Sequence, residues 1–378
     1  MSYRIPFNRV TLTGQELGYI QQAVQLGHLS GDGGFTRRCS EILQRELGTP
    51  KVLLTTSCTH ALEMSALLLE LRPGDEVIVP SFAFVTTVNA FVLHGARPVF
   101  ADVRPDTLNL DEARLESLIG PRTRAIVALH YAGVACELDP IVALARRSGA
   151  MLIEDNAHGL FARYRGQNLG TFGALATQSF HETKNLTCGE GGALLLNDPK
   201  YIERAEILRE KGTNRSRFFR GQVDKYTWVD VGSSYLPSEI LAAFLLAQLE
   251  HRALIQSERM RLWKRYQEEL AAWAARQGVG MPCVPEHCEQ PAHMFYLMMP
   301  SLDARTRFIE HLKRREILAV FHYQPLHLSE MGRRFGGRVG QCPVTEDVAD
   351  RLVRLPLFHG LGEADQSLVI ETVQSFSV

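Results

Sequence analysis

Short β-rich runs alternate with helical patterns along much of this 378-residue chain, and no other feature constrains its fold more. Two adjacent parallel strands need a crossover connection, which is usually a helix. Strands that alternate with helices therefore predict a mainly parallel sheet that is covered on both faces. We expect its seven strands at residues 51–54, 76–80, 97–101, 125–130, 150–154, 176–180 and 193–197.

The pattern changes beyond about Ser238, where long helical stretches begin. The chain is longer than the size at which a single core usually stops growing, about 250–300 residues. We therefore expect a large domain over residues 1–245, which includes an N-terminal arm, and a smaller C-terminal α/β domain over residues 246–378. Helices are expected at 15–26, 35–47, 59–71, 239–249, 254–277, 303–314 and 345–354, and the strands of the C-terminal domain at 294–299 and 318–323.

The composition argues against several classes of protein. The formal net charge is −1, so no overall field would hold nucleic acid or an anionic membrane surface. No apolar segment reaches the roughly 20 residues that span a bilayer, and we expect a protein that is neither exported nor embedded. The seven cysteines are scattered without a metal-type pairing, which favours a reducing cytoplasm and argues against a metal site. Dinucleotide-binding, P-loop, zinc-protease and serine-hydrolase motifs are missing from the sequence.

Lys184 lies in the stretch 179–185 (SFHETKN), directly before a glycine-rich turn at 189–192. A neutral lysine amine condenses with an aldehyde such as that of pyridoxal phosphate, whose ring nitrogen in turn needs a carboxylate partner. Asp155 ends an apolar run 184 − 155 = 29 residues earlier, which is about one strand–helix–strand unit. Both groups can therefore reach the same sheet edge, with His158 as a candidate neighbour of the cofactor's phenolic oxygen. Each residue alone is more often structural, and only the combination favours a cofactor site.

Ser57, Cys58 and Thr59 stand between a predicted strand and a predicted helix. Backbone N–H groups at a helix N-terminus bind anions, so a cofactor phosphate fits here, although an ordinary helix cap is the alternative. Phe84 follows another predicted strand, at the edge where such sheets bind ligands. It could stack on a pyridine ring, although an aromatic residue at a strand end more often belongs to the core.

Six motifs extend the pattern over the whole chain: residues 31–34 (GDGG), 80–85 (PSFAFV), 130–133 (HYAG), 154–158 (EDNAH), 179–185 (SFHETKN) and 322–323 (HY). Together they resemble the DegT/DnrJ/EryC1/StrS family of sugar aminotransferases. The resemblance implies a fold-type I α/β enzyme with pyridoxal 5′-phosphate as cofactor, a large domain with a mainly parallel seven-stranded sheet, and a smaller C-terminal α/β domain.

The resemblance also implies roles for individual residues. Lys184 would be the catalytic lysine, Asp155 would pair with the pyridinium nitrogen, and Phe84 would stack on the ring. The implied cofactor-binding set is Ser57, Cys58, Thr59, Phe84, Asp155, His158, Ser179, Lys184 and Ser234. The implied substrate-binding set is Gly33, Tyr131, Arg220, Lys225, Tyr226 and Tyr323.

Two positions depart from the family pattern. Ser234 stands where the family commonly places an asparagine from the neighbouring subunit on the cofactor phosphate, and its shorter hydroxyl leaves that contact open. Leu236 stands where an arginine is often found. The resemblance nevertheless implies a homodimer, or a larger assembly, with active sites at the subunit interface.

Within the family, residues 211–215, 220–228 and 232–235 resemble the branch that makes dTDP-4-amino-4,6-dideoxygalactose for enterobacterial common antigen. That branch transfers the amino group of L-glutamate to C4 of dTDP-4-dehydro-6-deoxy-D-glucose. The alternatives are a C3-specific or other nucleotide-sugar aminotransferase, another pyridoxal phosphate reaction such as decarboxylation, and a non-catalytic binding or regulatory protein. A related dehydratase branch carries histidine at the lysine position, so Lys184 argues against it.

Overall fold

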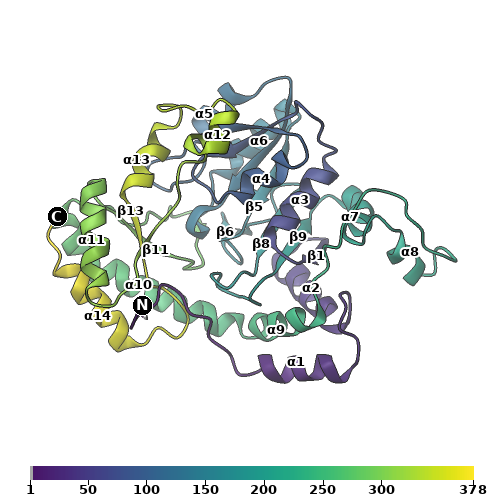
Figure 1. The fold of residues 1–378 in the computed structure, drawn as a ribbon, viewed down its shortest axis with the longest axis horizontal. Coiled ribbons are helices and arrows are strands. Elements are labelled where there is room, and N and C mark those ends of the chain that lie inside the picture. The colour runs from purple at the N-terminus through teal and green to yellow at the C-terminus, as the bar shows by residue number, and fades with distance from the viewer. Residues whose placement is uncertain (1–2) are drawn as a thin grey trace.

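The computed structural model describes residues 3–378, and its centre is a seven-stranded sheet (Figure 1). The strand order is β1-β9-β8-β5-β4-β2-β3. All pairs are parallel except those of β9, which runs antiparallel to β1 and β8. The seven predicted strands and the mainly parallel sheet are thereby confirmed. The strands are β1 (Lys51–Thr55), β2 (Glu76–Pro80), β3 (Arg97–Ala101), β4 (Thr123–Leu129), β5 (Met151–Asp155), β8 (Leu175–Ser179) and β9 (Gly192–Leu196).

Helices cover both faces of this sheet because its buried residues alternate between them. Val77 and Val79 pack into the cluster under α3, α4 and α7, whereas Ile78 packs on the opposite face with α6. A third cluster joins β1 and β9 to α2 and α9. These helices, with α1 and α5, are α1 (Glu16–Gln25), α2 (Gly34–Leu47), α3 (Cys58–Leu68), α4 (Thr86–Val92), α5 (Glu112–Leu115), α6 (Leu138–Ser148), α7 (Ile202–Arg209) and α9 (Glu239–Glu250).

The C-terminal part builds its own core around a small antiparallel sheet of order β11-β13-β12. It contains α10 (Arg252–Gln277), β11 (Phe295–Met298), α11 (Leu302–Lys313), β12 (Val320–Phe321), α12 (Glu330–Arg334), α13 (Pro343–Arg351), β13 (Leu352–Leu355) and α14 (Glu363–Gln374). The predicted helix at 345–354 is wrong in its last residues. The backbone turns extended at Leu352, because residues 352–355 pair with both neighbouring strands as the central strand of the sheet.

Two segments connect the N-terminal and C-terminal cores. Ile255, near the start of α10, packs with the large sheet, whereas Trp273 near its end packs in the C-terminal core. Ile5 also belongs to the C-terminal core and forms a bridge with Ile317. The division at residues 245 and 246 therefore stays a prediction.

An arm of residues 210–234, which contains α8 (Arg215–Phe219), extends away from the body (right side of Figure 1). A second small sheet joins β10 (Cys288–Glu289), β6 (Arg163–Tyr164) and β7 (Gln167–Asn168). The short 3-10 turns are η1 (Glu116–Leu118), η2 (Tyr131–Gly133), η3 (Pro199–Tyr201) and η4 (Leu326–Leu328). Within residues 3–378, no helix is both long and apolar enough to cross a membrane.

Candidate active site

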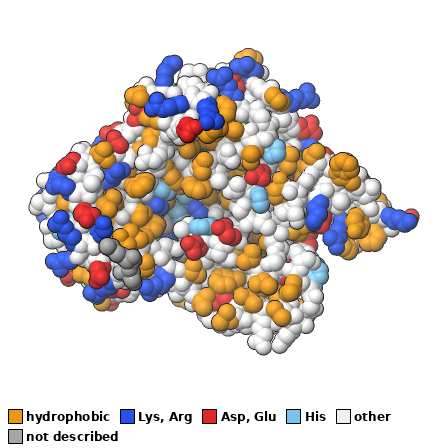
Figure 2. Space-filling view, viewed as in Figure 1, with side chains coloured by type: hydrophobic (Ala, Val, Ile, Leu, Met, Phe, Trp, Pro, Cys, Tyr) orange, Lys and Arg blue, Asp and Glu red, His pale blue; other side chains and the backbone are white. Residues whose placement is uncertain are grey.

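A cavity of about 640 Å³ opens at the carboxyl ends of the central strands, between the large sheet and the C-terminal part. Figure 2 shows histidine side chains in the hollow on this face of the molecule. Asp155 ends β5 and Lys184 lies in the turn after β8, and both line the cavity. β5 and β8 are parallel neighbours, with Asp155 opposite Thr177. The predicted meeting of lysine and carboxylate at one sheet edge is what the fold produces.

Lys184 is held where its amine is readily neutral. Burial lowers the pKa of Lys184 to about 8, although the nearby Cys58 and Asp155 act in the opposite direction. Its backbone is fixed by a hydrogen bond from its N–H to the carbonyl of His181, at 2.9 Å. An amine with such a pKa is partly unprotonated near neutral pH, which is the form that attacks an aldehyde.

Asp155 keeps part of its hydrogen-bonding capacity free. The Thr87 hydroxyl donates to Oδ2 at 2.7 Å, and the Ala157 N–H donates to Oδ1 at 3.3 Å. Burial raises the pKa of this carboxyl, while the bond from Thr87 and the charge of Lys184 act against that rise. Each carboxylate oxygen accepts about two hydrogen bonds, so a cationic or N–H partner in the cavity can still be bound.

The N-terminus of α3 faces the same cavity through Ser57, Cys58 and Thr59. The Ser57 hydroxyl accepts the N–H of His60 at 3.1 Å, so it serves as the helix cap that we considered as the alternative. The N–H groups of Cys58 and Thr59 lie in the first turn of the helix, where N–H groups have no intrahelical acceptor. They form the positive end of the helix dipole. Burial raises the pKa of the Cys58 thiol to about 12, which keeps it neutral beside a bound anion.

Three buried histidines, His158, His293 and His322, form another part of the cavity wall. The rings of His158 and His293 stack with centroids 4.4 Å apart, and the Tyr131 hydroxyl lies 3.0 Å from Nδ1 of His322. Burial holds the pKa of each histidine well below its usual range, so all three are neutral. Within the described part of the chain, Nδ1 of His158 is buried without a hydrogen-bond partner. A polar group of a bound ligand would satisfy it.

The cavity brings together most of the residues that the sequence singled out. Phe84 lies at the mouth, 55% exposed, with its ring 6.3 Å from that of Tyr323. The predicted residues that line the cavity are Ser57, Cys58, Thr59, Phe84, Asp155, His158, Ser179, Lys184 and Tyr323.

Six predicted residues do not line it within this chain. Tyr131 is fully buried behind His322, and Gly33 directly precedes α2, where its N–H donates to Glu239 Oε1 at 3.0 Å. A Cβ atom on Gly33 would lie 2.4 Å from the same carboxylate, which explains the glycine without a ligand. The others lie on the exposed arm: Arg220, Lys225, Tyr226 and Ser234.

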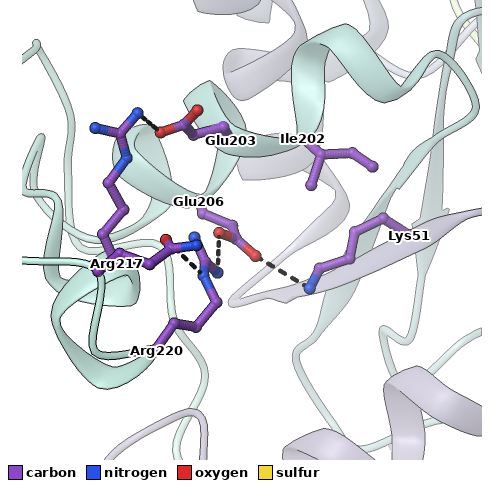
Figure 3. A pocket seen from close by; sticks show the side chains of 7 residues that line it. Lys51, Ile202, Glu203, Glu206, Arg217 and Arg220 are labelled. Atoms are coloured by element: carbon purple, nitrogen blue, oxygen red, sulfur yellow. Dashed lines mark hydrogen bonds and ion pairs between the residues drawn. The ribbon is translucent and has the colours of Figure 1, made fainter.

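Arg220 instead lines a second depression of about 570 Å³ at the base of the arm (Figure 3). Its guanidinium pairs with Glu206 at 2.8 Å, and Lys51 pairs with the same carboxylate at 3.0 Å. Arg220 on the arm and Lys51 on β1 therefore pair with the two oxygens of one carboxylate, that of Glu206 on α7. These two ion pairs anchor the arm to α7 and β1.

Several residues that line the cavity were not singled out by the sequence reasoning, among them Thr87, Arg354 and His293. Thr87 could have been found, because it is the second residue of the helix directly after the 80–85 motif. Arg354 was hidden by the wrong helix at 345–354, and no local pattern marks His293. All three line the cavity.

The residues fit pyridoxal 5′-phosphate in chemical terms. The N-terminus of α3 suits a phosphate, Asp155 suits a protonated ring nitrogen, and the unpartnered Nδ1 of His158 suits a polar ring substituent. Lys184 offers an amine of lowered pKa for the aldehyde. A mainly parallel sheet with this set at its carboxyl edge defines the class of aminotransferases with fold-type I architecture.

Residues 11–374 match the DegT/DnrJ/EryC1/StrS aminotransferase family, and the chain belongs to it. An uncharacterized protein of Methanocaldococcus jannaschii is 33% identical over 350 residues, with 90% of each chain covered. The aminotransferase TlmJ of Streptoalloteichus hindustanus is 30% identical and superposes with a TM-score of 0.89, covering 99% of this chain and 98% of that one. A putative sugar aminotransferase of Streptococcus pneumoniae, Spr1654 in its PLP form, is 25% identical with a TM-score of 0.91, covering 99% and 98%.

Proposed function

We propose that this sugar aminotransferase moves the amino group of L-glutamate to C4 of dTDP-4-dehydro-6-deoxy-D-glucose. The products are 2-oxoglutarate and dTDP-4-amino-4,6-dideoxy-D-galactose, a building block for enterobacterial common antigen or a related surface polysaccharide. The observation that carries aminotransfer is the lysine of lowered pKa beside the buried carboxylate of Asp155. The choice of sugar rests on the branch motifs in residues 211–235.

The cofactor is pyridoxal 5′-phosphate, which when bound supplies a ring that draws electrons from the reacting carbon. Asp155 would keep the ring nitrogen protonated, and the N–H groups of Cys58 and Thr59, with Ser179, would hold the phosphate. The Lys184 amine would take a proton from Cα of glutamate and pass it to the aldehyde-derived carbon of the cofactor. In the second half-reaction it would take a proton from that carbon and deliver it to C4 of the sugar. Neutral His158 and Tyr323 orient the ring substituent without adding charge.

We propose that the arm completes the site of a second copy of this chain. Arg220, Lys225, Tyr226 and Ser234 lie away from the cavity of their own chain. The same arm exposes apolar surface, with Trp228 78% and Phe219 70% exposed. Exposed patches of this kind mark interaction surfaces in soluble proteins. A homodimer would cover them and bring the four polar residues to the partner's cavity.

The direct test supplies the purified enzyme with pyridoxal phosphate, L-glutamate and dTDP-4-dehydro-6-deoxy-D-glucose. Mass spectrometry and NMR of the product are expected to identify an axial amine at C4. An equatorial C4 amine, or an amine at C3 from a 3-keto isomer, would contradict the sugar assignment while leaving aminotransfer in place. Cofactor binding without any aminated product from nucleotide keto sugars would favour a binding or regulatory protein.

Subunit complementation tests the shared site. A Lys184→Ala chain and a Tyr226→Ala chain are each expected to be inactive, and their equimolar mixture after co-refolding should recover about one quarter of the wild-type rate. Half of the random dimers then contain one intact site of two. No recovery, with both chains dimeric, would place Tyr226 outside the partner's site. The seven free thiols suit a reducing compartment, and we propose a cytoplasmic location.

A further inference from the structure

His293 belongs to none of the sequence motifs, yet its ring stacks on that of His158 in the wall of the cavity. The ring centroids lie 4.4 Å apart, with an angle of 20° between the two planes. Both side chains are buried and line the same cavity as Lys184. A nearly parallel stack in a close-packed interior leaves little room for either ring to turn. The orientation of His158 therefore depends on where His293 is held.

The Asn185 side chain connects the His293 ring to the turn that carries Lys184. Its Nδ2 donates to the carbonyl of Pro291 at 2.6 Å and to Gln256 Oε1 at 3.3 Å. Its Oδ1 is thereby directed to Nδ1 of His293, 2.9 Å away. Burial holds the pKa of His293 well below its usual range, so the ring is neutral and carries one proton. Since an amide oxygen can only accept, that proton lies on Nδ1, and the bond fixes both the tautomer and the rotation of the ring.

The backbone at His293 is held by hydrogen bonds as well. Arg259 on α10 donates from Nε to the carbonyl of Ala292 at 3.1 Å and from Nη2 to the carbonyl of His293 at 2.7 Å. The Gln290 side chain accepts the N–H of Ala292. Ala292 has a φ of 51°, a left-handed conformation that is unfavourable for a residue with a Cβ atom. Such conformations persist only where the surrounding structure imposes them, and they cluster at functional sites.

His158 has weaker anchors of its own. Its Nε2 lies 3.5 Å from the Tyr323 hydroxyl, at the limit of a hydrogen bond, and its Nδ1 has no partner within residues 3–378. Its other aromatic neighbours, Tyr131 and His322, are farther away, with 6.0 and 6.3 Å between ring centroids. The stack on His293 is therefore the contact that sets the orientation of this ring.

We propose that His293 is a positioning residue for His158, and that it holds the His158 ring against the phenolic oxygen of pyridoxal phosphate. Asn185 and Arg259 fix His293, and the stack transmits this order to His158. The same amide lies next to Lys184 in the chain, so one continuous set of contacts places the reacting amine relative to His158. This assignment deepens the proposed function and rests on the role given there to His158, not on the identity of the sugar.

The test measures binding of two compounds to the apoenzyme by absorbance titration. They are pyridoxal phosphate and its 3-deoxy analogue, which lacks the phenolic oxygen but keeps the aldehyde and the phosphate. His293→Ala is expected to raise the Kd for pyridoxal phosphate about 5- to 10-fold and to change the Kd for the analogue less than about twofold. His293→Phe keeps a flat ring against His158 and should recover most of the loss. Asn185→Leu should give a smaller loss with the same preference.

His311→Ala is the matched control. His311 also lies in the C-terminal part, contacts the ring of Phe376 and bonds the carbonyl of Thr372, but it does not line the cavity. This variant should leave both Kd values within about twofold of wild type.

The two compounds separate positioning from general damage to the fold. Equal weakening of both by His293→Ala would overturn the proposal, as would unchanged binding of pyridoxal phosphate in His293→Ala and Asn185→Leu. If thermal unfolding shows that His293→Ala does not fold, Asn185→Leu decides by the same comparison. A wild-type enzyme that binds the cofactor but aminates no nucleotide sugar would refute the proposed substrate, and the binding comparison would still test His293.

Discussion

Glu154 and Asp155 are consecutive buried carboxylates at the end of β5, yet the two faces of the sheet treat them differently. On one face, Glu154 accepts His130 Nε2 at 3.0 Å and the N–H groups of Gly170, Phe172 and Gly173 at 2.7–2.8 Å. On the other face, Asp155 accepts two hydrogen bonds within residues 3–378, from Thr87 and Ala157, and lines the cavity.

The difference shows that unused hydrogen-bonding capacity distinguishes a ligand-binding carboxylate from a structural one. Glu154 is fully occupied by its own chain, so it stabilises the loop directly before β8 and has nothing left for a ligand. Asp155 keeps unused capacity beside Lys184 and the unpartnered Nδ1 of His158. Spare hydrogen-bonding capacity, gathered in one place, distinguishes the site from the equally polar interior on the other face.

The largest effect is expected from replacing Lys184, which lies in the cavity on the Asp155 face of the sheet. Lys184→Ala should abolish turnover, because no other lysine among residues 3–378 lines the cavity to react with the cofactor aldehyde or move the proton. Steady-state product formation measures this, and thermal unfolding should show no loss of stability. Sustained transamination by the variant would contradict the assignment, whereas slow rescue by an added amine would not.

The second prediction concerns the protonation of Lys184. Because burial places its pKa at about 8 instead of 10.5, the apoenzyme should take up pyridoxal phosphate about 50-fold faster at pH 8 than at pH 6 and level off about one pH unit above pH 8. Stopped-flow absorbance gives the rate. A rate of uptake that continues to rise to pH 10 would mean that the cavity does not lower the pKa of Lys184. The same shift implies that stability contributed by this group increases from about pH 8 toward 10.5, since the unfolded chain then binds more protons.

Glu154→Gln tests the face of the sheet on which the carboxylate is fully hydrogen-bonded by its own chain. The amide nitrogen would confront N–H groups that now meet a carboxylate oxygen, so the free energy of unfolding should fall by about 2–3 kcal/mol. Chemical denaturation measures the loss, and kcat per folded molecule should remain within about threefold of wild type. A Glu154→Gln variant with normal stability and little activity would show that Glu154 serves the active site as Asp155 does, and it would contradict the comparison.

Asp155→Asn makes the same change one residue later. It should lower kcat/KM by a factor that corresponds to about 1.5–3 kcal/mol, because the charge-assisted contact to the cofactor ring is lost. The free energy of unfolding should change by less than that of Glu154→Gln. Parallel kinetics and denaturation of the two variants provide the measurement, and a reversed order of stabilities would contradict it.

The smallest effect is expected from Thr87→Val. This change removes one hydrogen bond to Asp155, at 2.7 Å, and should cost about 0.5–1.5 kcal/mol in kcat/KM. Since that bond lowers the pKa of Asp155, the acid limb of the pH profile should move to higher pH. An unchanged acid limb would show that Thr87 does not tune the carboxylate.

Much of the fold followed from the sequence because the signals were local. Each of the seven strands of the large sheet carried its own apolar run, and the parallel order placed Asp155 and Lys184 at one edge. β13 was mistaken for the end of a helix because its strand state depends on pairing with β11 and β12, which are distant in sequence. The same error concealed Arg354, and the position of His293 depends on stacking against His158 from another part of the chain.

Local motifs also could not place the arm. The motifs at 211–215, 220–228 and 232–235 predicted a branch of the family, but the distance of residues 220–228 from the cavity follows only from the three-dimensional path of the chain. Arg220 is the clearest case, since its guanidinium pairs with Glu206 at the base of the arm.

The bridge between Ile5 and Ile317 has a consequence for synthesis. On the ribosome the two residues are made 317 − 5 = 312 positions apart, so Ile5 waits about 15–60 s for its partner to emerge. During that time the large sheet can form, but Ile5 and Phe7 still lack Ile317 and Arg354, their contacts in the C-terminal part. The wall of the cavity is therefore completed last, and a chain released before its C-terminal sheet is made would carry Lys184 in a site without a closed side.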